Sequence, residues 1–550
     1  MRHFSSALLL LAATALVSAL QDPHEYAAKL ARASQDSPGG KTAHKDGSGC
    51  QDSAKHSVGA FSNPKTARFA VKGNKLPDVN FDIGESYAGT LSVTNVSSAA
   101  DRLYFWFFPS ANPAAKKEIV IWLNGGPGCS SMQGVLQENG PLLWAPGTYE
   151  AVPNPYSWTK LTNVVYIDQP VGTGFSQGNV PVNNETDVSR HFLGFWKNFV
   201  DTFSLKGYKV YITGESYAGQ YIPYIAAAML DTGDKSYFNV SGIQINDPLI
   251  NYPATMREVT VIPALERYNN VIPLDEPTVT LLKSQADSCG YTDFHNNHTN
   301  NFPPTGPIPE PPSPSAPGCN LCSIAPNCSL YALVVVAALQ NNPCFNSLHL
   351  TDFCPYLWNA QGYPSLAGGP NNYFNRSDVQ RAINAPKTDY YVCLPRPNLF
   401  PREDTSLPSG LGPLPSVIER TKNVIIAHGM LDFLLFAEGS LITIQNMTWG
   451  GLQGFQSRPS ASKNFWVPFH DSIETIIGLV SAPLPNPAPQ YNTAGAGHQG
   501  TTHSERGLTF VTVDLAGHFM PQYTPGAAFR QLEFLLGRIS SLEQRGPYTA

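Results

Sequence analysis

The hexapeptide GESYAG at residues 214–219 presents a serine in the spacing G-x-S-x-G. A serine in this spacing stands on a sharp turn between a strand and a helix, and the two glycines give the turn room and backbone freedom. Residues 209–213 are rich in β-branched and aromatic side chains, which favours a buried strand. Residues 220–230 carry apolar side chains at helical spacing. We therefore predict that Ser216 is a nucleophile.

The same hexapeptide occurs at residues 84–89, so the motif alone does not identify the nucleophile. The residues after this copy, TLSVTNVSS, alternate as in an exposed strand and show no helical pattern. A helix should follow the nucleophile, because a helix N-terminus stabilises developing negative charge. Ser216 has that context and Ser86 lacks it. We interpret Ser86 as a coincidental surface serine.

A nucleophilic serine needs a base, and the base needs an acid that orients it. After a G-x-S-x-G turn the expected chain order is serine, acid, histidine, with the last two on loops that follow late strands. The apolar segment 423–427 leads to Asp432, and the apolar segment 508–513 leads to His518. Asp432 and His518 are therefore the predicted acid and base.

Other residues could fill these two roles. Asp514 is a rival acid, although it shares its loop with His518. His428 is more typical of a packed or solvated histidine. The rival histidines without a preceding strand are His470, His498 and His503.

Acyl chemistry also needs backbone donors for the oxyanion. The segment WLNGGPGCSS at 122–131 follows a strongly apolar strand, and its glycines let a backbone N–H approach a substrate oxygen closely. We predict that Gly126 and Tyr217 donate their N–H groups to this oxygen. The alternative is a plain turn at the end of the strand.

The elements that must position these residues follow from apolar runs. Strands are predicted at 103–108, 118–123, 163–168, 209–213, 423–428 and 508–513, and helices at 187–204, 220–230 and 525–536. Strands separated by helices favour an α/β protein, with a mostly parallel central sheet and helical crossovers on its faces.

The remaining regions divide as follows. Residues 1–19 have a basic start, an apolar core and small residues near the end, which predicts a secretory signal peptide. Residues 20–65 are a polar leader and a candidate propeptide, and residues 66–550 form the catalytic domain. Residues 250–400, with a proline-rich run at 303–318, are predicted to be an insertion over the sheet. Residues 450–507 are predicted to be a surface insertion.

Composition limits the function classes. A net charge of −6 does not indicate the basic surface that binding to nucleic acid requires. No other stretch is apolar for long enough to span a membrane, so no membrane partner is expected once the signal peptide is removed. The candidate site residues call for no cofactor.

The cysteines and N-x-S/T sequons fit an oxidising, secretory compartment, either outside the cell or in a vacuole or lysosome-like compartment. Nine cysteines leave at least one unpaired, and Cys50 in the polar leader is the candidate. Cys319-x-x-Cys322 has no matching second pair, so no metal site is predicted. Predicted glycosylation sites are Asn95, Asn184, Asn239, Asn297, Asn327, Asn375 and Asn446.

Several motifs together resemble the serine carboxypeptidase family, and in particular its secreted fungal members. They are WLNGGPGCSS, ENGP (138–141), NPYSW (154–158), DQPVGTGFS (168–176), GESYAGQYIP and AGH before the last helix. The resemblance covers about residues 100–540. It implies an α/β-hydrolase fold with a disulfide-containing cap insertion, and the release of single amino acids from peptide C-termini.

The resemblance also implies roles for further residues. A clamp for the substrate carboxylate maps onto Asn124, Gly125, Glu138 and Glu215. Phe519 follows the histidine where many relatives have methionine or valine, and it would line the pocket for the leaving residue. The family pattern pairs Cys129 with Cys393. Cys344 and Cys354 would close a short local loop, whereas the pairing among Cys289, Cys319, Cys322 and Cys328 stays open.

The expected activity is a secreted serine-type carboxypeptidase that works at acidic pH through an acyl-enzyme. Acidic pH is expected because a substrate carboxylate beside Glu138 and Glu215 requires at least one of them to hold a proton. An acyltransferase or an esterase with the same triad is the alternative. The preferred C-terminal residue, the physiological substrate and the oligomeric state do not follow from these motifs.

Overall fold

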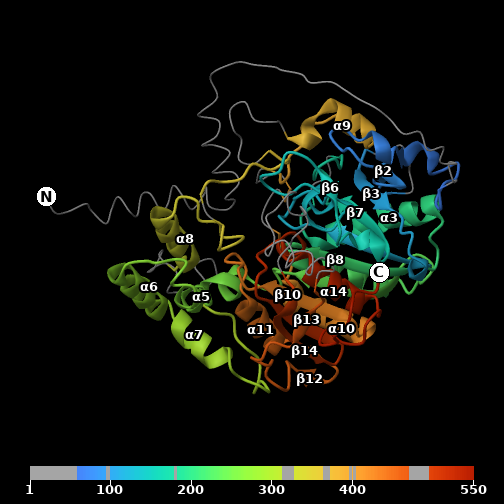
Figure 1. The fold of residues 1–550 in the computed structure, drawn as a ribbon. Coiled ribbons are helices and arrows are strands. Elements are labelled where there is room, and N and C mark those ends of the chain that lie inside the picture. Colours follow the sequence, from blue (N-terminus) through green and yellow to red (C-terminus); the bar gives the residue numbers. More distant parts are fainter. Residues whose placement is uncertain are drawn as a thin grey trace, which may run out of the picture.

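The computed structural model describes residues 59–94, 100–178, 182–312, 328–352, 354–362, 372–394, 399–400, 404–469 and 495–550. An eleven-stranded sheet runs through the centre of this part of the chain (Figure 1). In spatial order its strands are β1 (Ala70–Val71), β2 (Ser86–Ser92), β3 (Arg102–Phe108), β7 (Asn163–Asp168), β4 (Glu118–Leu123), β8 (Lys209–Glu215), β9 (Asn239–Asn246), β10 (Val424–Gly429), β15 (Leu508–Val513), β14 (Gly497–Glu505) and β13 (Phe465–Val467).

The sheet is parallel in its centre and antiparallel at both edges. All neighbouring pairs from β7 to β15 are parallel. The pairs from β1 to β7, and those from β15 to β13, are antiparallel. The predicted α/β-hydrolase fold is confirmed, although the expectation of a mostly parallel sheet holds only for its centre. The central strands read as continuous apolar runs because helices cover both of their faces.

Helices pack on both faces of the sheet. On one face lie α3 (Glu185–Phe203), α4 (Ala218–Asp231) and α10 (Leu414–Thr421), whose buried residues form one apolar cluster with the strands. On the other face lie α14 (Pro525–Leu535) and α9 (Ser377–Ala382), within a second cluster. The helices predicted at 187–204, 220–230 and 525–536 correspond to α3, α4 and α14.

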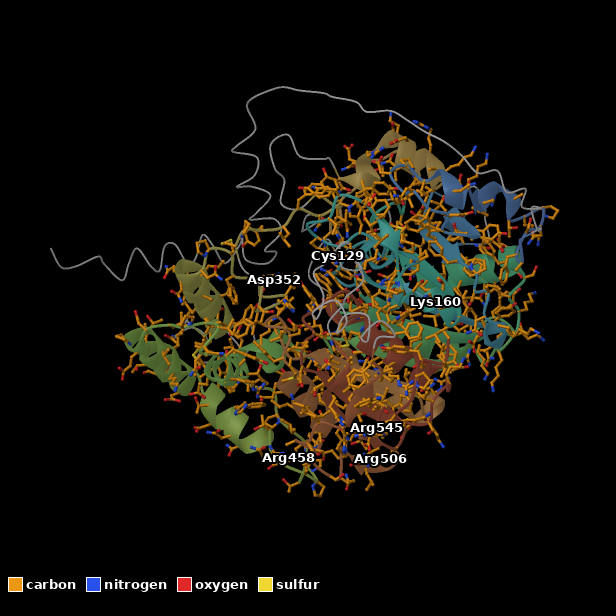
Figure 2. The ribbon with its side chains drawn as sticks, in the orientation of Figure 1. Cys129, Lys160, Asp352, Arg458, Arg506 and Arg545 are labelled. Atoms are coloured by element: carbon orange, nitrogen blue, oxygen red, sulfur yellow. A yellow bond between two sulfur atoms is a disulfide. The ribbon has the colours of Figure 1, made fainter. Side chains whose placement is uncertain are left out.

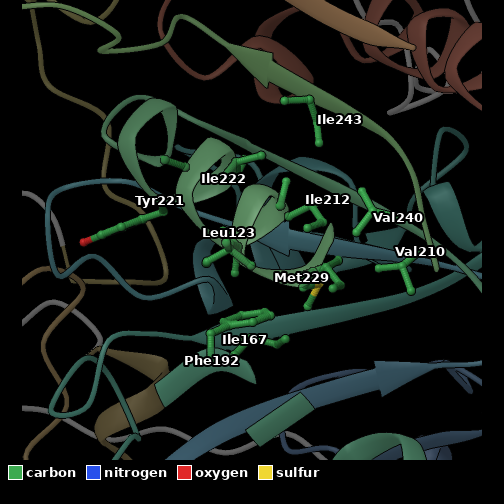
Figure 3. Packing of buried hydrophobic residues seen from close by; sticks show 14 of the residues in the cluster. Leu123, Ile167, Phe192, Val210, Ile212, Tyr221, Ile222, Met229, Val240 and Ile243 are labelled. Atoms are coloured by element: carbon green, nitrogen blue, oxygen red, sulfur yellow. The ribbon is translucent and has the colours of Figure 1, made fainter. Parts of the chain in front are cut away.

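The helix after the candidate nucleophile is fixed by apolar packing. Tyr221, Ile222 and Met229 of α4 are fully buried, and they pack in one cluster with Leu123 of β4 and Ile212 of β8 (Figure 3). Each such side chain contributes about 1.5–3 kcal/mol by leaving water. The start of α4 is therefore held rigidly at the end of β8.

The insertion predicted at 250–400 divides into two parts. Its first part contains α5 (Val261–Arg267), α6 (Glu276–Ser288), α7 (Tyr291–His298) and α8 (Leu330–Asn341), which stand beside the sheet (Figure 1). These helices share a third apolar cluster, which also includes Phe433, Phe436 and Ile442. We call this part the cap. Its second part, with η7 (Tyr373–Asn375) and α9, packs on the sheet instead.

Shorter elements complete the described ranges. They are η1 (Ala67–Phe69), η2 (Gly73–Lys75), η3 (Pro113–Ala115), η4 (Gly134–Glu138), η5 (Trp158–Lys160), η6 (Ala254–Glu258), η8 (Ser409–Leu411), α11 (Ala437–Asn446), α13 (Met520–Tyr523), β5 (Leu142–Leu143), β6 (Val152–Pro153), β11 (Thr448–Trp449) and β12 (Leu452–Gln453). Among the described residues, no helix is long and apolar enough to cross a membrane.

One sequence-based interpretation is wrong, whereas the boundary of the predicted leader stays a prediction. Residues 450–507 are not only a surface insertion, because β13 and β14 within them extend the central sheet. The polar leader predicted at 20–65 is packed on the body by residue 61 at the latest. The Phe61 ring lies 5.1 Å from the Phe107 ring of β3, and the Phe61 N–H donates to Glu85 Oε1. Residues 1–58, with the predicted signal peptide and Cys50, lie outside the described ranges.

Candidate active site

Ser216 stands on a tight turn between β8 and α4. Its φ of +62° is in the left-handed region, which is unusual for a residue with a side chain and is typical of a strained nucleophile turn. A Cβ on Gly214 would lie 2.1 Å from the Leu123 carbonyl oxygen, and one on Gly219 would lie 2.6 Å from the Leu249 carbonyl oxygen. Both glycines of the motif are thus required by close packing, and Ser216 remains partly exposed.

The second copy of the hexapeptide folds differently. Ser86 begins β2, where its backbone is extended and pairs with Val71. Its side chain is 2% exposed, and its hydroxyl accepts a hydrogen bond from Trp106 Nε1 at 3.2 Å. The interpretation of Ser86 as a surface serine is therefore wrong, since it is a core residue in a strand.

Asp432 and His518 meet at the carboxyl ends of neighbouring strands. Asp432 follows β10 and His518 follows β15, and His518 Nδ1 lies 2.8 Å from Asp432 Oδ2. The two loops touch closely enough that a Cβ on Gly429 would lie 2.4 Å from the Gly517 carbonyl oxygen. Both side chains are buried.

The rival residues have other partners. Asp514 forms an ion pair with Lys463 at the surface. His428 is fully buried and its Nε2 lies 2.8 Å from Ser440 Oγ, so it is packed and not solvated. His503 contacts Glu505. His498 is exposed on β14, and His470 lies outside the described ranges.

The loop after β4 packs directly on the Ser216 turn. A Cβ on Gly125 would lie 2.5 Å from the Tyr217 nitrogen and 2.7 Å from Ser216 Cβ, so only glycine fits there. Gly126 is the next residue, with a φ of +114° that also suits glycine. The Tyr217 hydroxyl donates to Asp404 Oδ2 at 2.6 Å, which fixes this residue at the start of α4.

Asp168 holds the loop after β4 in place through hydrogen bonds. Its Oδ1 accepts hydrogen bonds from Ser130 Oγ at 2.7 Å and from the Ser131 N–H at 2.9 Å, and its Oδ2 accepts one from the Phe175 N–H at 2.9 Å. Burial raises the pKa of Asp168 to about 6. Sequence reasoning missed this role, although Asp168 ends a predicted strand and opens the DQPVGTGFS motif.

Two buried glutamates meet at Asn124. Asn124 Nδ2 donates to Glu138 Oε1 at 3.0 Å and to Glu215 Oε1 at 2.8 Å, while Asn124 Oδ1 accepts from Trp122 Nε1 at 2.8 Å. Burial raises the pKa of Glu138 to about 7. Burial, followed by the nearby charge of Glu138, raises the pKa of Glu215 well above its ordinary value. The pair therefore holds a proton under acidic conditions, and the second oxygen of each carboxyl has no hydrogen-bond partner among the described residues.

One segment of the chain ties the Asp432 loop and the His518 loop together. The Leu348 carbonyl accepts from the His518 N–H at 2.7 Å, the Ser347 carbonyl accepts from the Phe433 N–H at 2.8 Å, and the Leu350 N–H donates to the Leu431 carbonyl at 3.0 Å. The disulfide Cys344–Cys354 brackets this segment. It therefore fixes the segment that borders both Asp432 and His518.

Phe519 is partly exposed beside His518. Its ring centroid lies 5.5 Å from that of His518. Near it, His349 stacks on Tyr523 with ring centroids 3.7 Å apart. Aromatic side chains thus border the histidine on this side.

Both disulfides expected from the sequence are present, and one open pairing is resolved. Cys129, labelled near the middle of Figure 2, is bonded to Cys393 and so ties the loop after β4 to the segment after α9. Cys289 is bonded to Cys328 within the cap. Cys319 and Cys322 lie outside the described ranges.

The predicted glycosylation sites differ in exposure. Asn297 and Asn375 are exposed, and Asn184, Asn239 and Asn446 are partly exposed. Asn375 Nδ2 already donates to the Tyr390 carbonyl at 3.0 Å. Asn95 and Asn327 lie outside the described ranges. Glycosylation at all of these sites remains a prediction.

Comparison with known proteins agrees with this arrangement. The family model described as serine carboxypeptidase matches residues 77–537, which is most of the chain. This chain belongs to the serine carboxypeptidase family. It is therefore a serine-type carboxypeptidase, a hydrolase whose substrates are peptides.

Individual relatives cover nearly the whole enzyme. A carboxypeptidase Y homolog of Arthroderma benhamiae is 51% identical over 87% of this carboxypeptidase and 89% of the relative. The serine-type carboxypeptidase F of Aspergillus niger is 39% identical over 88% and 89% of the two chains. The crystal structure of Kex1Δp, a prohormone-processing carboxypeptidase from Saccharomyces cerevisiae, covers 86% of this chain and 97% of its own, with a TM-score of 0.64 and 23% identity. This structural likeness supports the fold.

No metal site accompanies these groups in the part of the carboxypeptidase that the structure describes. Within it, no cluster of His, Cys, Asp and Glu side chains is arranged to hold a metal ion. The groups on the loops at this end of the sheet are an imidazole, carboxyls, an amide and backbone N–H groups. Together these can move protons and stabilise an oxyanion.

Proposed function

We propose that this carboxypeptidase releases single amino acids from peptide C-termini through an acyl-enzyme on Ser216, at acidic pH. The observation that carries the proposal is the buried pair of glutamates joined by Asn124, directly beside the nucleophile turn. A protonated carboxyl can donate a hydrogen bond to a substrate carboxylate, whereas two ionised ones would repel it.

The chemistry follows from the Ser216, His518 and Asp432 arrangement. Ser216 Oγ attacks the last peptide carbonyl carbon while His518 Nε2 takes the hydroxyl proton, and this proton then passes to the departing amine as the C–N bond breaks. Water attacks the resulting ester with His518 again as the base, which frees the shortened peptide and restores Ser216. Asp432 accepts the His518 Nδ1–H and stabilises the imidazolium.

The oxyanion of each tetrahedral intermediate requires donors that are already in place. We assign these to the N–H groups of Gly126 and Tyr217. The close packing of Gly125 on the Ser216 turn supports this assignment, because it brings the glycine loop next to the reacting hydroxyl. The start of α4 adds the positive end of a helix dipole.

The clamp assignment explains why only terminal residues are removed. Asn124, Gly125, Glu138 and Glu215 would hold the free carboxylate of the last residue, so its peptide bond is placed at Ser216. Phe519 would contact the side chain of the departing residue. With a pKa of about 7 for Glu138, the clamp holds its proton in acid and loses it on the alkaline side.

The environment of the enzyme is also a proposal. The features of residues 1–19, the sequons and the three disulfides among the described residues support secretion, either outside the cell or into a vacuolar compartment.

The test is product analysis with an N-blocked dipeptide at acidic pH. We expect release of the free C-terminal amino acid, and a much slower reaction with the C-terminal amide of the same dipeptide. Transfer of the blocked residue to an added alcohol in preference to water would indicate an acyltransferase. Equal rates for the free acid and a simple ester without a carboxylate would indicate an esterase and contradict the clamp.

A further inference from the structure

A third buried carboxyl, Asp247, lies between the nucleophile turn and the aspartate loop. It follows β9, which runs between β8 and β10 in the sheet. Its neighbour Asn246 accepts the Ser216 N–H at 2.9 Å, and its own N–H donates to the Ala427 carbonyl at 2.7 Å. The Asp247 side chain is fully buried. No step of the proposed mechanism uses it.

The Asp247 carboxyl is fixed toward the triad. Its Oδ1 accepts the Gly429 N–H at 2.8 Å, and the Gly429 carbonyl accepts the Asp432 N–H at 3.1 Å. The electrostatic neighbours of the Asp247 carboxyl include the Asp432 side chain, which acts on it through charge and a side-chain contact. Asp247 Oδ2 is buried and has no hydrogen-bond partner among the described residues, so it is the oxygen free to share a proton with Asp432. Two carboxyls in such contact need a proton between them.

In the described part of the chain, no positive charge that would favour the ionised form of Asp247 faces its carboxyl. His428 on β10 has its Nδ1 3.6 Å from Asp247 Oδ1, but burial lowers the pKa of His428 to about 3, so it is neutral. Two other titratable groups face Asp247. They are Asp432, which follows β10 and is hydrogen-bonded to His518, and Glu215 at the end of β8. Burial, followed by the charge of Asp432, raises the pKa of Asp247 well above its ordinary value.

We propose that Asp247 is a positioning residue of the triad, whose protonated carboxyl donates a hydrogen bond to Asp432 and holds that carboxylate against His518. Asp432 has room to accept it. Its Oδ1 already accepts the Leu434 N–H at 2.7 Å and its Oδ2 faces His518 Nδ1, but each carboxylate oxygen has a second lone pair. Asp247 acts through Asp432 and does not touch the substrate. This inference rests on the proposed triad.

The backbone conformation of Asp247 decides which substitutions can test the proposal. Asp247 has a φ of +45°, a conformation that asparagine and glycine adopt readily and alanine does not. Asp247→Asn keeps a neutral donor of the same shape. Asp247→Gly removes the donor without backbone strain. Glu118→Gln is the matched control, because Glu118 is also a buried carboxyl with a pKa raised by burial, but it stands at the opposite end of β4.

The assay is the second-order rate of Ser216 phosphonylation by an uncharged aryl phosphonate, measured from about pH 4 to pH 9 on the full-length enzyme. This probe has no carboxylate, so the glutamate clamp does not contribute. The acid limb of the profile reports protonation of His518. Thermal melting of each variant checks that it is folded, and kcat and KM for a blocked dipeptide are measured in parallel.

We expect Asp247→Gly to label about 10- to 100-fold more slowly, as for a misplaced catalytic group, with kcat lowered and KM unchanged. Its acid limb should move to higher pH, because an Asp432 without its donor holds the imidazolium proton more strongly. Asp247→Asn and Glu118→Gln should label with the rate and profile of the wild type. An unchanged rate and profile in Asp247→Gly would overturn the proposal. So would an Asp247→Asn variant that is folded but as slow as Asp247→Gly. Absence of labelling at Ser216 in the wild type would instead contradict the proposed function itself.

Discussion

The proposed glutamate clamp leads to a quantitative prediction about KM and pH. With a pKa of about 7, the Glu138 carboxyl is almost fully protonated at about pH 5, and only about one tenth of it remains protonated at about pH 8. If only the protonated clamp binds the substrate carboxylate, KM should rise about tenfold over this range, equivalent to about 1.4 kcal/mol. The value of kcat should change less, because the substrate is already in place once it is bound.

Glu215→Gln should remove this dependence. An amide donates a hydrogen bond at every pH, so the KM of the variant should stay nearly constant where that of the wild type rises. The matched control is Glu258→Gln. Glu258 is a partly buried carboxyl whose pKa is also raised to about 7, mainly by burial, but it lies at the base of the cap. This control variant should keep the rise in KM.

The assay is kcat and KM for an N-blocked dipeptide from about pH 4 to pH 8. The C-terminal amide of the same dipeptide serves as a substrate control, because it lacks the carboxylate and its KM should not follow the titration. A wild-type KM that stays constant from acid to neutral pH would refute the clamp assignment, although not the triad. A Glu215→Gln variant with the full wild-type rise in KM would refute the role of this residue.

Three further changes have defined outcomes. Gly125→Ala should lower kcat by about 100-fold, because its Cβ would displace the Ser216 turn while the fold is kept. Cys393→Ser should destabilise the protein by about 2–4 kcal/mol and also lower kcat, because the bond to Cys129 anchors the loop to which we assign an oxyanion donor. The melting temperature should fall as the pH rises from about 4.5 to 7, because Glu258 has a folded-state pKa raised to about 7. Its contribution is fully present below its unfolded pKa and is lost at about 1.4 kcal/mol per pH unit as the folded pKa is approached.

Each of these outcomes can be contradicted. The measurements are steady-state kinetics with circular dichroism for Gly125→Ala, and denaturant unfolding together with kinetics for Cys393→Ser. A Gly125→Ala enzyme with wild-type kcat would show that the loop after β4 does not constrain the position of the Ser216 turn. Wild-type stability in Cys393→Ser would show that the disulfide is dispensable. A melting temperature that rises across that pH window would contradict the raised carboxyl pKa values.

The central strands and their terminal residues could be predicted from sequence. Strands such as β4, β8 and β10 are buried on both faces, so they appear as unbroken apolar runs, and the polar residue after each run lies at the carboxyl edge. For this reason the hydrogen bond between Asp432 and His518 joins two residues chosen from chain order and from their positions after two late strands.

Features that depend on distant pairing could not be predicted. Ser86 lies in a second copy of the hexapeptide that contains Ser216. Only the pairing of β2 with β1 and β3 buries Ser86. The polar strand β14 is a strand because β13 and β15 flank it. No sequence motif marked Asp247 as a candidate site residue, because its proximity to Asp432 depends on β9 and β10 being neighbours in the sheet.

The duplicated hexapeptide allows the central claim to be tested directly. The measurement is the release of the C-terminal amino acid from an N-blocked dipeptide by the wild type, Ser216→Ala and Ser86→Ala at acidic pH. We predict that Ser216→Ala loses activity by many orders of magnitude, because a member of the triad is removed. Ser86→Ala should keep nearly all of it, with a small loss of stability from the hydrogen bond to Trp106. An inactive Ser86→Ala enzyme, or an active Ser216→Ala enzyme, would contradict the assignment of Ser216 as the nucleophile.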